Sequence, residues 1–136
     1  MGLRYYPGCF DDDSKTFIDL YMKSGLYPAE IVRRIYTSTK MKQKYPDDNA
    51  RLQHIFSKQV YGLAPTSIIY RIAMNFIFGF NAGHKMDRSH FKLCNTLPYA
   101  ENGRWKKNLK NCLERKINNC KRNYLCDVNG CSWKLK

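Results

Sequence analysis

Apolar residues recur at helical spacing along most of this 136-residue chain, and alternation typical of strands is absent over any useful length. Acidic residues and proline stand where apolar segments begin, and glycine stands where they end, as at helix boundaries. The predicted helical segments are residues 11–25, 27–45, 46–62, a fourth from 65 to an exit at 79–83, a short 87–95 and 102–123. The sequence therefore predicts an all-α fold, a single-domain bundle of about five helices over about 11–122, followed by a tail at 123–136.

The segment "IIYRIAMNFIFGF" at residues 68–80 is apolar nearly all round. On a helical wheel one stripe is predicted to face the core and contains Ile69, Ile72, Ala73, Phe76 and Phe80. The opposite side carries Arg71 and Asn75 beside a second apolar set, namely Tyr70, Met74, Ile77 and Phe78. Either this helix is covered on every side, or the second set is an exposed apolar patch, which we predict inserts into a membrane.

Lys and Arg number 24 against 11 Asp and Glu, which gives a formal net charge of +13. Such a charge attracts phospholipid, nucleic acid or acidic glycan, and its sign alone does not choose among them. A solvated surface is the simpler interpretation of a basic helix face. The last helical segment, however, has only Glu114 as an acidic partner for its cations. We predict that these basic residues dock on a partner: Arg33, Arg34, Lys40, Lys106, Lys107, Lys110, Arg115, Lys121 and Arg122.

The cysteines are even in number and concentrated toward the C-terminus. This pattern is typical of a secreted domain, and it predicts three disulfides that staple the tail, with the pairing left open. Six reduced, buried cysteines are one alternative. A zinc site built from His90 and three cysteines is another, although no CxxC pair is present. The disulfide candidates are Cys9, Cys94, Cys112, Cys120, Cys126 and Cys131.

Sequence motifs for catalysis are missing from the chain. It contains no P-loop, GxGxxG, GxSxG or HExxH, and the acidic residues 11–13 are typical of a helix N-terminus. We therefore expect no enzyme, no cofactor and no metal. Nucleic-acid binding has charge but no recognition motif to support it. The first ten residues hold no signal-peptide apolar run, so we expect a mature secreted form, and residues 64–83 are too polar for a transmembrane helix.

With the segments in place, the chain resembles the gastropod sperm acrosomal proteins, abalone lysin and its fusagenic paralogue. The resemblance rests on the order of "KTF" at 15–17, "SGLYPAEIVRRI" at 24–35, "YRIAMNFIFGF" at 70–80 and "LPY" at 97–99. It implies a five-helix bundle, kept in the acrosomal vesicle and secreted, that acts by binding rather than catalysis. Lysin-like members open the egg envelope, and the fusagenic member is thought to merge membranes. The six cysteines, the tail and the aromatic loading favour the fusagenic member.

The resulting hypothesis is a secreted sperm protein that binds anionic membrane through basic and apolar patches and promotes sperm–egg fusion. One alternative is a lysin-like protein that binds an egg-surface glycoprotein and uses the apolar face as a homodimer interface. The other is a disulfide-rich cationic toxin or antimicrobial protein.

Overall fold

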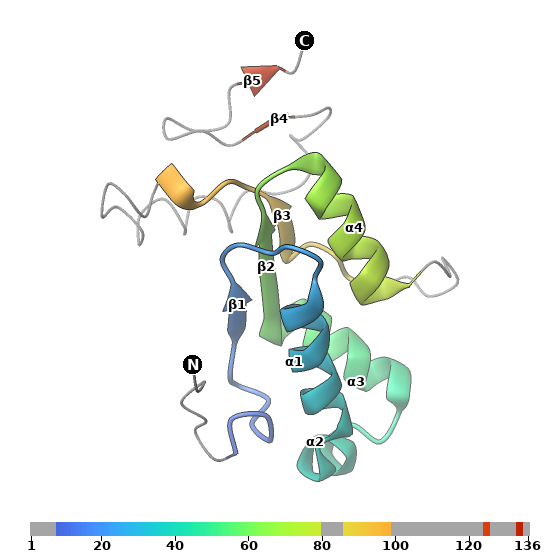
Figure 1. The fold of residues 1–136 in the computed structure, drawn as a ribbon. Coiled ribbons are helices and arrows are strands. Elements are labelled where there is room, and N and C mark those ends of the chain that lie inside the picture. The colour runs from blue at the N-terminus through green and yellow to red at the C-terminus, as the bar shows by residue number, and fades with distance from the viewer. Residues whose placement is uncertain (1–7, 80–85, 99–123, 126–132, 135–136) are drawn as a thin grey trace.

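The structure is a computed structural model that describes residues 8–79, 86–98, 124–125 and 133–134. In these residues helices alternate with short strands (Figure 1). The elements are β1 (Phe17–Asp19), α1 (Leu26–Thr37), α2 (Thr39–Lys44), α3 (Asp48–His54), the π-helical turn η1 (Ile55–Gln59), β2 (Val60–Ala64), α4 (Ser67–Phe78), β3 (Phe91–Leu93), β4 (Tyr124–Leu125) and β5 (Trp133–Lys134).

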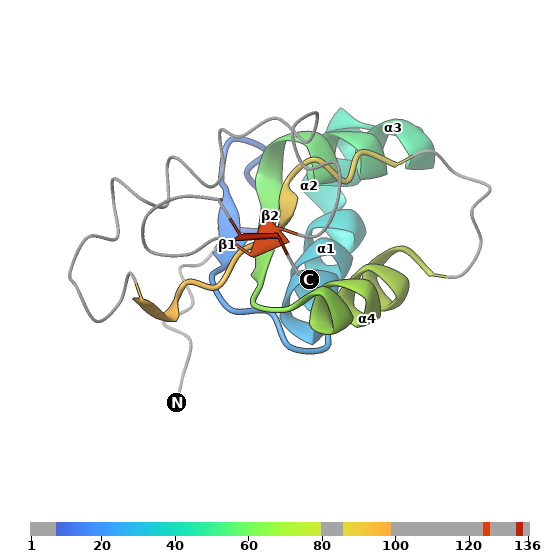
Figure 2. The same ribbon diagram turned by 90° about the horizontal axis from the view of Figure 1, so that it is seen from above.

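The centre of the fold is a three-stranded parallel sheet in the order β1-β2-β3, with Phe17 opposite Val60 and Gly62 opposite Phe91. The separate strands β4 and β5 form an antiparallel pair. Two neighbouring parallel strands are joined by a crossover connection. Right-handed crossovers that move across the sheet in one direction, from β1 to β2 to β3, place their helices on the same face of the sheet. Accordingly, α1 and α4 lie on one side of the sheet and contact each other (Figures 1 and 2).

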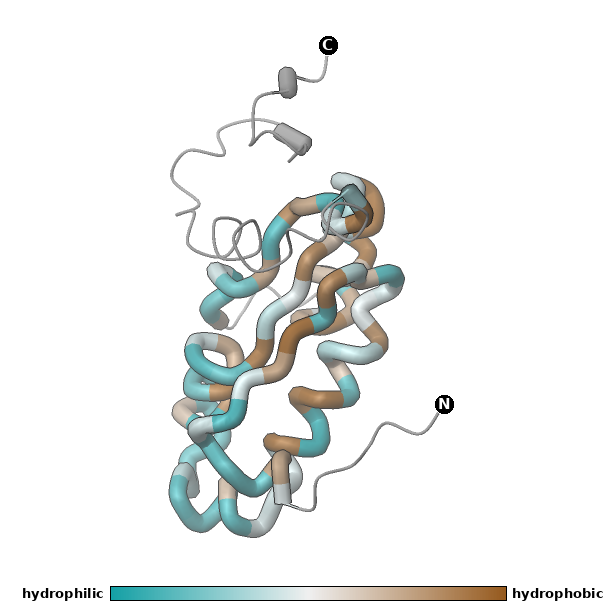
Figure 3. Tube along the Cα trace, turned by 90° about the vertical axis from the view of Figure 1, so that its left-hand side faces the viewer, coloured by the Kyte–Doolittle hydropathy of each residue, from teal (hydrophilic) through white to brown (hydrophobic). Residues whose placement is uncertain are grey.

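The core lies between this face of the sheet and the two helices. Its largest fully buried side chains include Met22, Ile35, Ile55 and Phe91. The side chains of Met22 and Phe91 pack directly against Gly62 in the central strand. A Cβ at Gly62 would overlap the Met22 sulfur and lie 3.0 Å from the Phe91 ring. In Figure 3 brown and white segments lie along the strands, whereas the lower end, where α2 lies, is mostly teal.

Local side-chain hydrogen bonds explain where the middle helices begin. Ser38 separates α1 from α2, and its hydroxyl accepts from the Met41 N–H at 3.3 Å as an N-cap. The Asp47 carboxylate accepts from the Ala50 N–H at 2.7 Å and begins α3 in the same way. The predicted single helix over 27–45 is therefore two helices that meet at Ser38.

The predicted all-α bundle is wrong, because the described residues form a mixed α/β fold. Residues 11–25 contain β1 rather than a helix: the Asp12 carboxylate accepts from the Ser14 N–H at 2.9 Å and holds a turn instead of a helix end. The predicted helix at 46–62 ends at Gln59, and β2 follows. The predicted short helix at 87–95 is β3, so His90 and Cys94 flank a strand and do not share a helix face.

Two predictions for the helices are confirmed. The predicted segment from Pro65 to an exit at 79–83 contains α4, which begins after the Thr66 cap and ends at Gly79. The helical wheel of segment 27–45 places Ile31, Val32, Ile35 and Tyr36 on one side, with Arg33 opposite. In α1 Val32 and Ile35 are buried, Ile31 and Tyr36 are partly buried, and Arg33 is exposed. The predicted helix at 102–123 lies outside the described residues.

Candidate functional site: the outer face of α4

A row of large apolar side chains lies exposed along α4. Ile68, Ile72 and Phe76 are 70%, 51% and 54% exposed, and we call these three residues the α4 ridge. Their spacing of four residues places them one above another on a helix. Arg71 and Asn75 are exposed beside them, and Arg71 is the only charged residue in α4.

The apolar set predicted to be exposed instead packs inward. Met74 is 5% exposed, and Tyr70, Ile77 and Phe78 are partly buried against the core cluster. Phe78 contacts two core rings, with centroid distances of 4.6 Å to Phe56 and 5.5 Å to Phe91. The prediction that these four residues form an exposed insertion patch is therefore wrong.

The companion prediction for the core stripe is wrong in part. Ala73 is fully buried and Ile69 packs against the core, but Ile72 and Phe76 belong to the exposed α4 ridge. Phe80 lies outside the described residues. Arg71 and Asn75 were the signal that could have corrected the wheel, because Ile68 and Ile72 lie next to them on the helix surface.

The start of α1 adds two more exposed apolar side chains close to α4. Gly25 precedes α1, and a Cβ there would lie 3.0 Å from the Ala73 backbone and 3.1 Å from Ile77. The next two residues, Leu26 and Tyr27, are 58% and 69% exposed. Two further exposed apolar side chains thus lie where α1 begins, near its contact with α4.

Covering the α4 ridge would release substantial free energy. Full burial of an Ile or Phe side chain contributes about 1.5 to 3 kcal/mol. Each ridge residue exposes half or more of its surface. A partner that covers the three outer faces would therefore gain roughly 2 to 5 kcal/mol, by half of that full burial. The arrangement suits binding to an apolar surface.

The predicted basic residues fall into two groups. Arg33 and Arg34 lie exposed at the end of α1, and both contact Glu30, with N–O distances of 2.7 and 2.9 Å. Lys40 is exposed in α2. The other six predicted docking residues lie outside the described part of the chain: Lys106, Lys107, Lys110, Arg115, Lys121 and Arg122.

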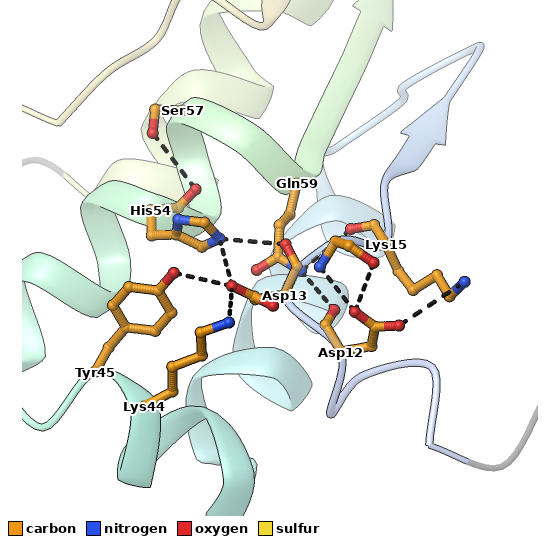
Figure 4. Close-up of polar contacts among 9 residues, drawn as sticks. Asp12, Asp13, Lys15, Lys44, Tyr45, His54, Ser57 and Gln59 are labelled. Carbon is orange, nitrogen blue, oxygen red and sulfur yellow. Dashed lines mark hydrogen bonds and ion pairs between the residues drawn. The ribbon is translucent and has the colours of Figure 1, made fainter.

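A second polar cluster surrounds Asp13 (Figure 4). Its carboxylate accepts from the Tyr45 hydroxyl at 3.0 Å and pairs with Lys44 at 2.7 Å, while His54 Nε2 lies 3.2 Å from the Asp13 carbonyl oxygen. The Lys44 hydrogen bond, helped by Tyr45, lowers the pKa of Asp13. Gln59 donates to the carbonyls of Asp12 and Lys15 at 3.1 Å. These contacts fix the loop before β1 onto α2, α3 and η1, which is a structural role.

Cysteine and metal chemistry receive little support from the described residues. Cys9 is half-buried and Cys94 is buried, and no disulfide joins them. The other four candidates, Cys112, Cys120, Cys126 and Cys131, lie outside the described residues, so the predicted disulfide staples remain unsupported. Within the described ranges no three His, Cys, Asp or Glu residues gather as metal ligands. None of the helices in those ranges has the length and apolar character to cross a membrane.

Comparison with protein-family models, curated proteins and solved structures found no match to this chain.

Proposed function

We propose that this protein binds the surface of anionic membranes, with the α4 ridge inserted among the lipids. The observation that carries the proposal is the exposure of Ile68, Ile72 and Phe76, by half or more, along one line of one helix. An interfacial helix of this kind places its apolar face about 5 to 10 Å into the boundary between head groups and acyl chains.

Charge favours a lipid surface over a protein partner. α4 contains no acidic residue, and its one cation, Arg71, lies beside the α4 ridge. Lys23, just before Gly25, is a second exposed cation near the start of α1. A Lys or Arg close to an anionic bilayer contributes about 1 kcal/mol. The net charge of +13 also attracts the whole molecule to such a surface.

The narrower hypotheses rest on other grounds. Three hypotheses stay predictions from the resemblance: promotion of sperm–egg fusion, secretion from an acrosome and binding to an egg-surface glycoprotein. The five-helix bundle that the same resemblance implies is wrong. The cationic toxin stays a prediction from composition, and membrane binding as proposed here requires neither idea.

Co-sedimentation with vesicles tests the proposal by comparing the wild type with a variant of the α4 ridge. Replacing Ile72 and Phe76 by serine should weaken binding to phosphatidylserine vesicles by about tenfold or more, because two half-exposed side chains lose their burial in lipid. Leu97→Ser is the matched control, since Leu97 is also 51% exposed but lies beyond β3. This control should bind as the wild type does.

Two results would contradict the proposal. One is equal binding by the ridge variant and the wild type. The other is wild-type protein that ignores vesicles but forms a dimer in sedimentation equilibrium, which the ridge variant does not form. In that case a second copy of the chain, and not lipid, would cover the α4 ridge.

A further inference from the structure

A shallow polar hollow lies at the opposite end of α1 from the α4 contact. Its volume is about 430 Å³, and its lining comes from residues 10–11, 33–34 and 37–39. α1 advances about 1.5 Å per residue, so Arg33, the first residue of α1 that lines the hollow, lies about 12 Å along the helix axis from Gly25. The hollow is therefore distinct from the α4 ridge.

Glu30 holds the two arginines of the hollow side by side. Arg33 donates to both Glu30 carboxylate oxygens, at 2.8 and 2.7 Å, and Arg34 Nε donates to one of them at 2.9 Å. Hydrogen bonds from Arg33 and Arg34 lower the pKa of Glu30 to about 2. The carboxylate thus stays charged at neutral pH and limits the freedom of both guanidinium groups before any ligand arrives.

Arg34 keeps its terminal donors available. Only its Nε has a hydrogen-bond partner among the described residues, and the Arg34 side chain is 45% exposed. The guanidinium carbon lies 5.5 Å from the centroid of the Phe10 ring. Thr39 also lines the hollow, and its hydroxyl has no recorded partner in the described part of the chain. An oriented guanidinium with paired free N–H groups matches the oxygens of a phosphate.

We propose that this hollow binds one phosphate group, with Arg34 as the principal donor and Arg33 and Thr39 as further contacts. Asp11 limits the charge of the ligand. Its carboxylate, which accepts from the Ser38 hydroxyl at 2.6 Å, lies in the same hollow and repels a second anionic group. The phosphate can belong to a lipid head group or to a soluble compound, since the recognising groups are the same.

An NMR titration with inorganic phosphate, at constant ionic strength set with chloride, tests the site. We expect saturable amide shifts confined to residues 33–40 and the Phe10 loop. Arg34→Gln should weaken phosphate binding about fivefold, through loss of a charge-assisted hydrogen bond. Asp11→Asn should strengthen binding about threefold, through loss of repulsion. Arg71→Gln removes a cation from α4 and should leave the affinity unchanged.

A second experiment, binding to vesicles, distinguishes a lipid phosphate from a soluble phosphate compound. If Arg34→Gln also weakens binding to phosphatidic acid vesicles, the source is a lipid head group; if only the titration responds, the source is a soluble phosphate compound. Shifts that never saturate, or an Arg34→Gln affinity equal to that of the wild type, would overturn the site. The α4 ridge variant should keep wild-type phosphate affinity, so failure of this inference and failure of membrane binding are distinguishable.

Discussion

α1 and α4 are helices of twelve residues that pack against the same sheet and against each other (Figure 1). Their outer faces, however, differ. Beyond its first turn, α1 presents Glu30 and the two arginines that pair with it, Arg33 and Arg34. α4 presents the α4 ridge and the single cation Arg71. Packing in the core determines only the side chains on the inner face of each helix. The side chains on the outer face are therefore free to suit a binding partner or solvent.

Truncating one side chain on each face of α4 tests directly whether one face is buried and the other exposed. Met74→Ala removes a side chain that is 5% exposed and should lower the free energy of unfolding by about 2 to 4 kcal/mol, because it leaves a cavity. Ile72→Ala removes a half-exposed side chain and should change that free energy by less than about 1 kcal/mol. Urea unfolding followed by circular dichroism measures both.

The two variants also test whether the helical wheel or the structure gives the correct buried face of α4. The wheel places Ile72 in the core and Met74 outside, so it predicts the reverse order of destabilisation. A larger loss for Ile72→Ala than for Met74→Ala would mean that the described orientation of α4 is wrong, and the proposed insertion face with it.

A smaller effect is expected where the two helices touch. Gly25 has a φ of +84° and no room for a Cβ beside Ala73, so Gly25→Ala should cost about 2 to 3 kcal/mol of unfolding free energy. Gly8 has a φ of +82°, and a Cβ there would meet its nearest atom only at 3.9 Å. Gly8→Ala should therefore cost about 1 kcal/mol, for the backbone conformation alone. Equal losses in urea unfolding would show that α1 and α4 do not meet closely at Gly25.

The sequence predicts α4 and the buried side of α1 because both have long periodic segments with clear ends. It fails for the strands because β1, β2 and β3 have three, five and three residues, too few for alternation to show. β2 is also mostly buried, as central parallel strands are, and "VYGLA" therefore continues the apolar pattern of the preceding helix.

The α4 ridge was missed for a different reason. A helix that is apolar on both faces gives the wheel only a weak direction, which in α4 comes from Arg71 and Asn75 alone. The tightest contact of α4, between Ala73 and Gly25, depends on two residues that are far apart in sequence. No local pattern encodes that contact, although it decides which apolar face is buried.

The smallest expected effect concerns the outer face of α1. The pKa of Glu30 is about 2 in the folded protein, against an ordinary value of 4.5, because Arg33 and then Arg34 hydrogen-bond its carboxylate. A folded pKa below the unfolded one stabilises the fold above pH 4.5, and this contribution is lost as the pH falls toward 2. The group is exposed, so the gain is small. The urea midpoint of Glu30→Gln should lie slightly below that of the wild type at pH 7, and the gap should close by pH 2. A gap that persists at pH 2 would mean that packing, and not charge, distinguishes the outer face of α1 from that of α4.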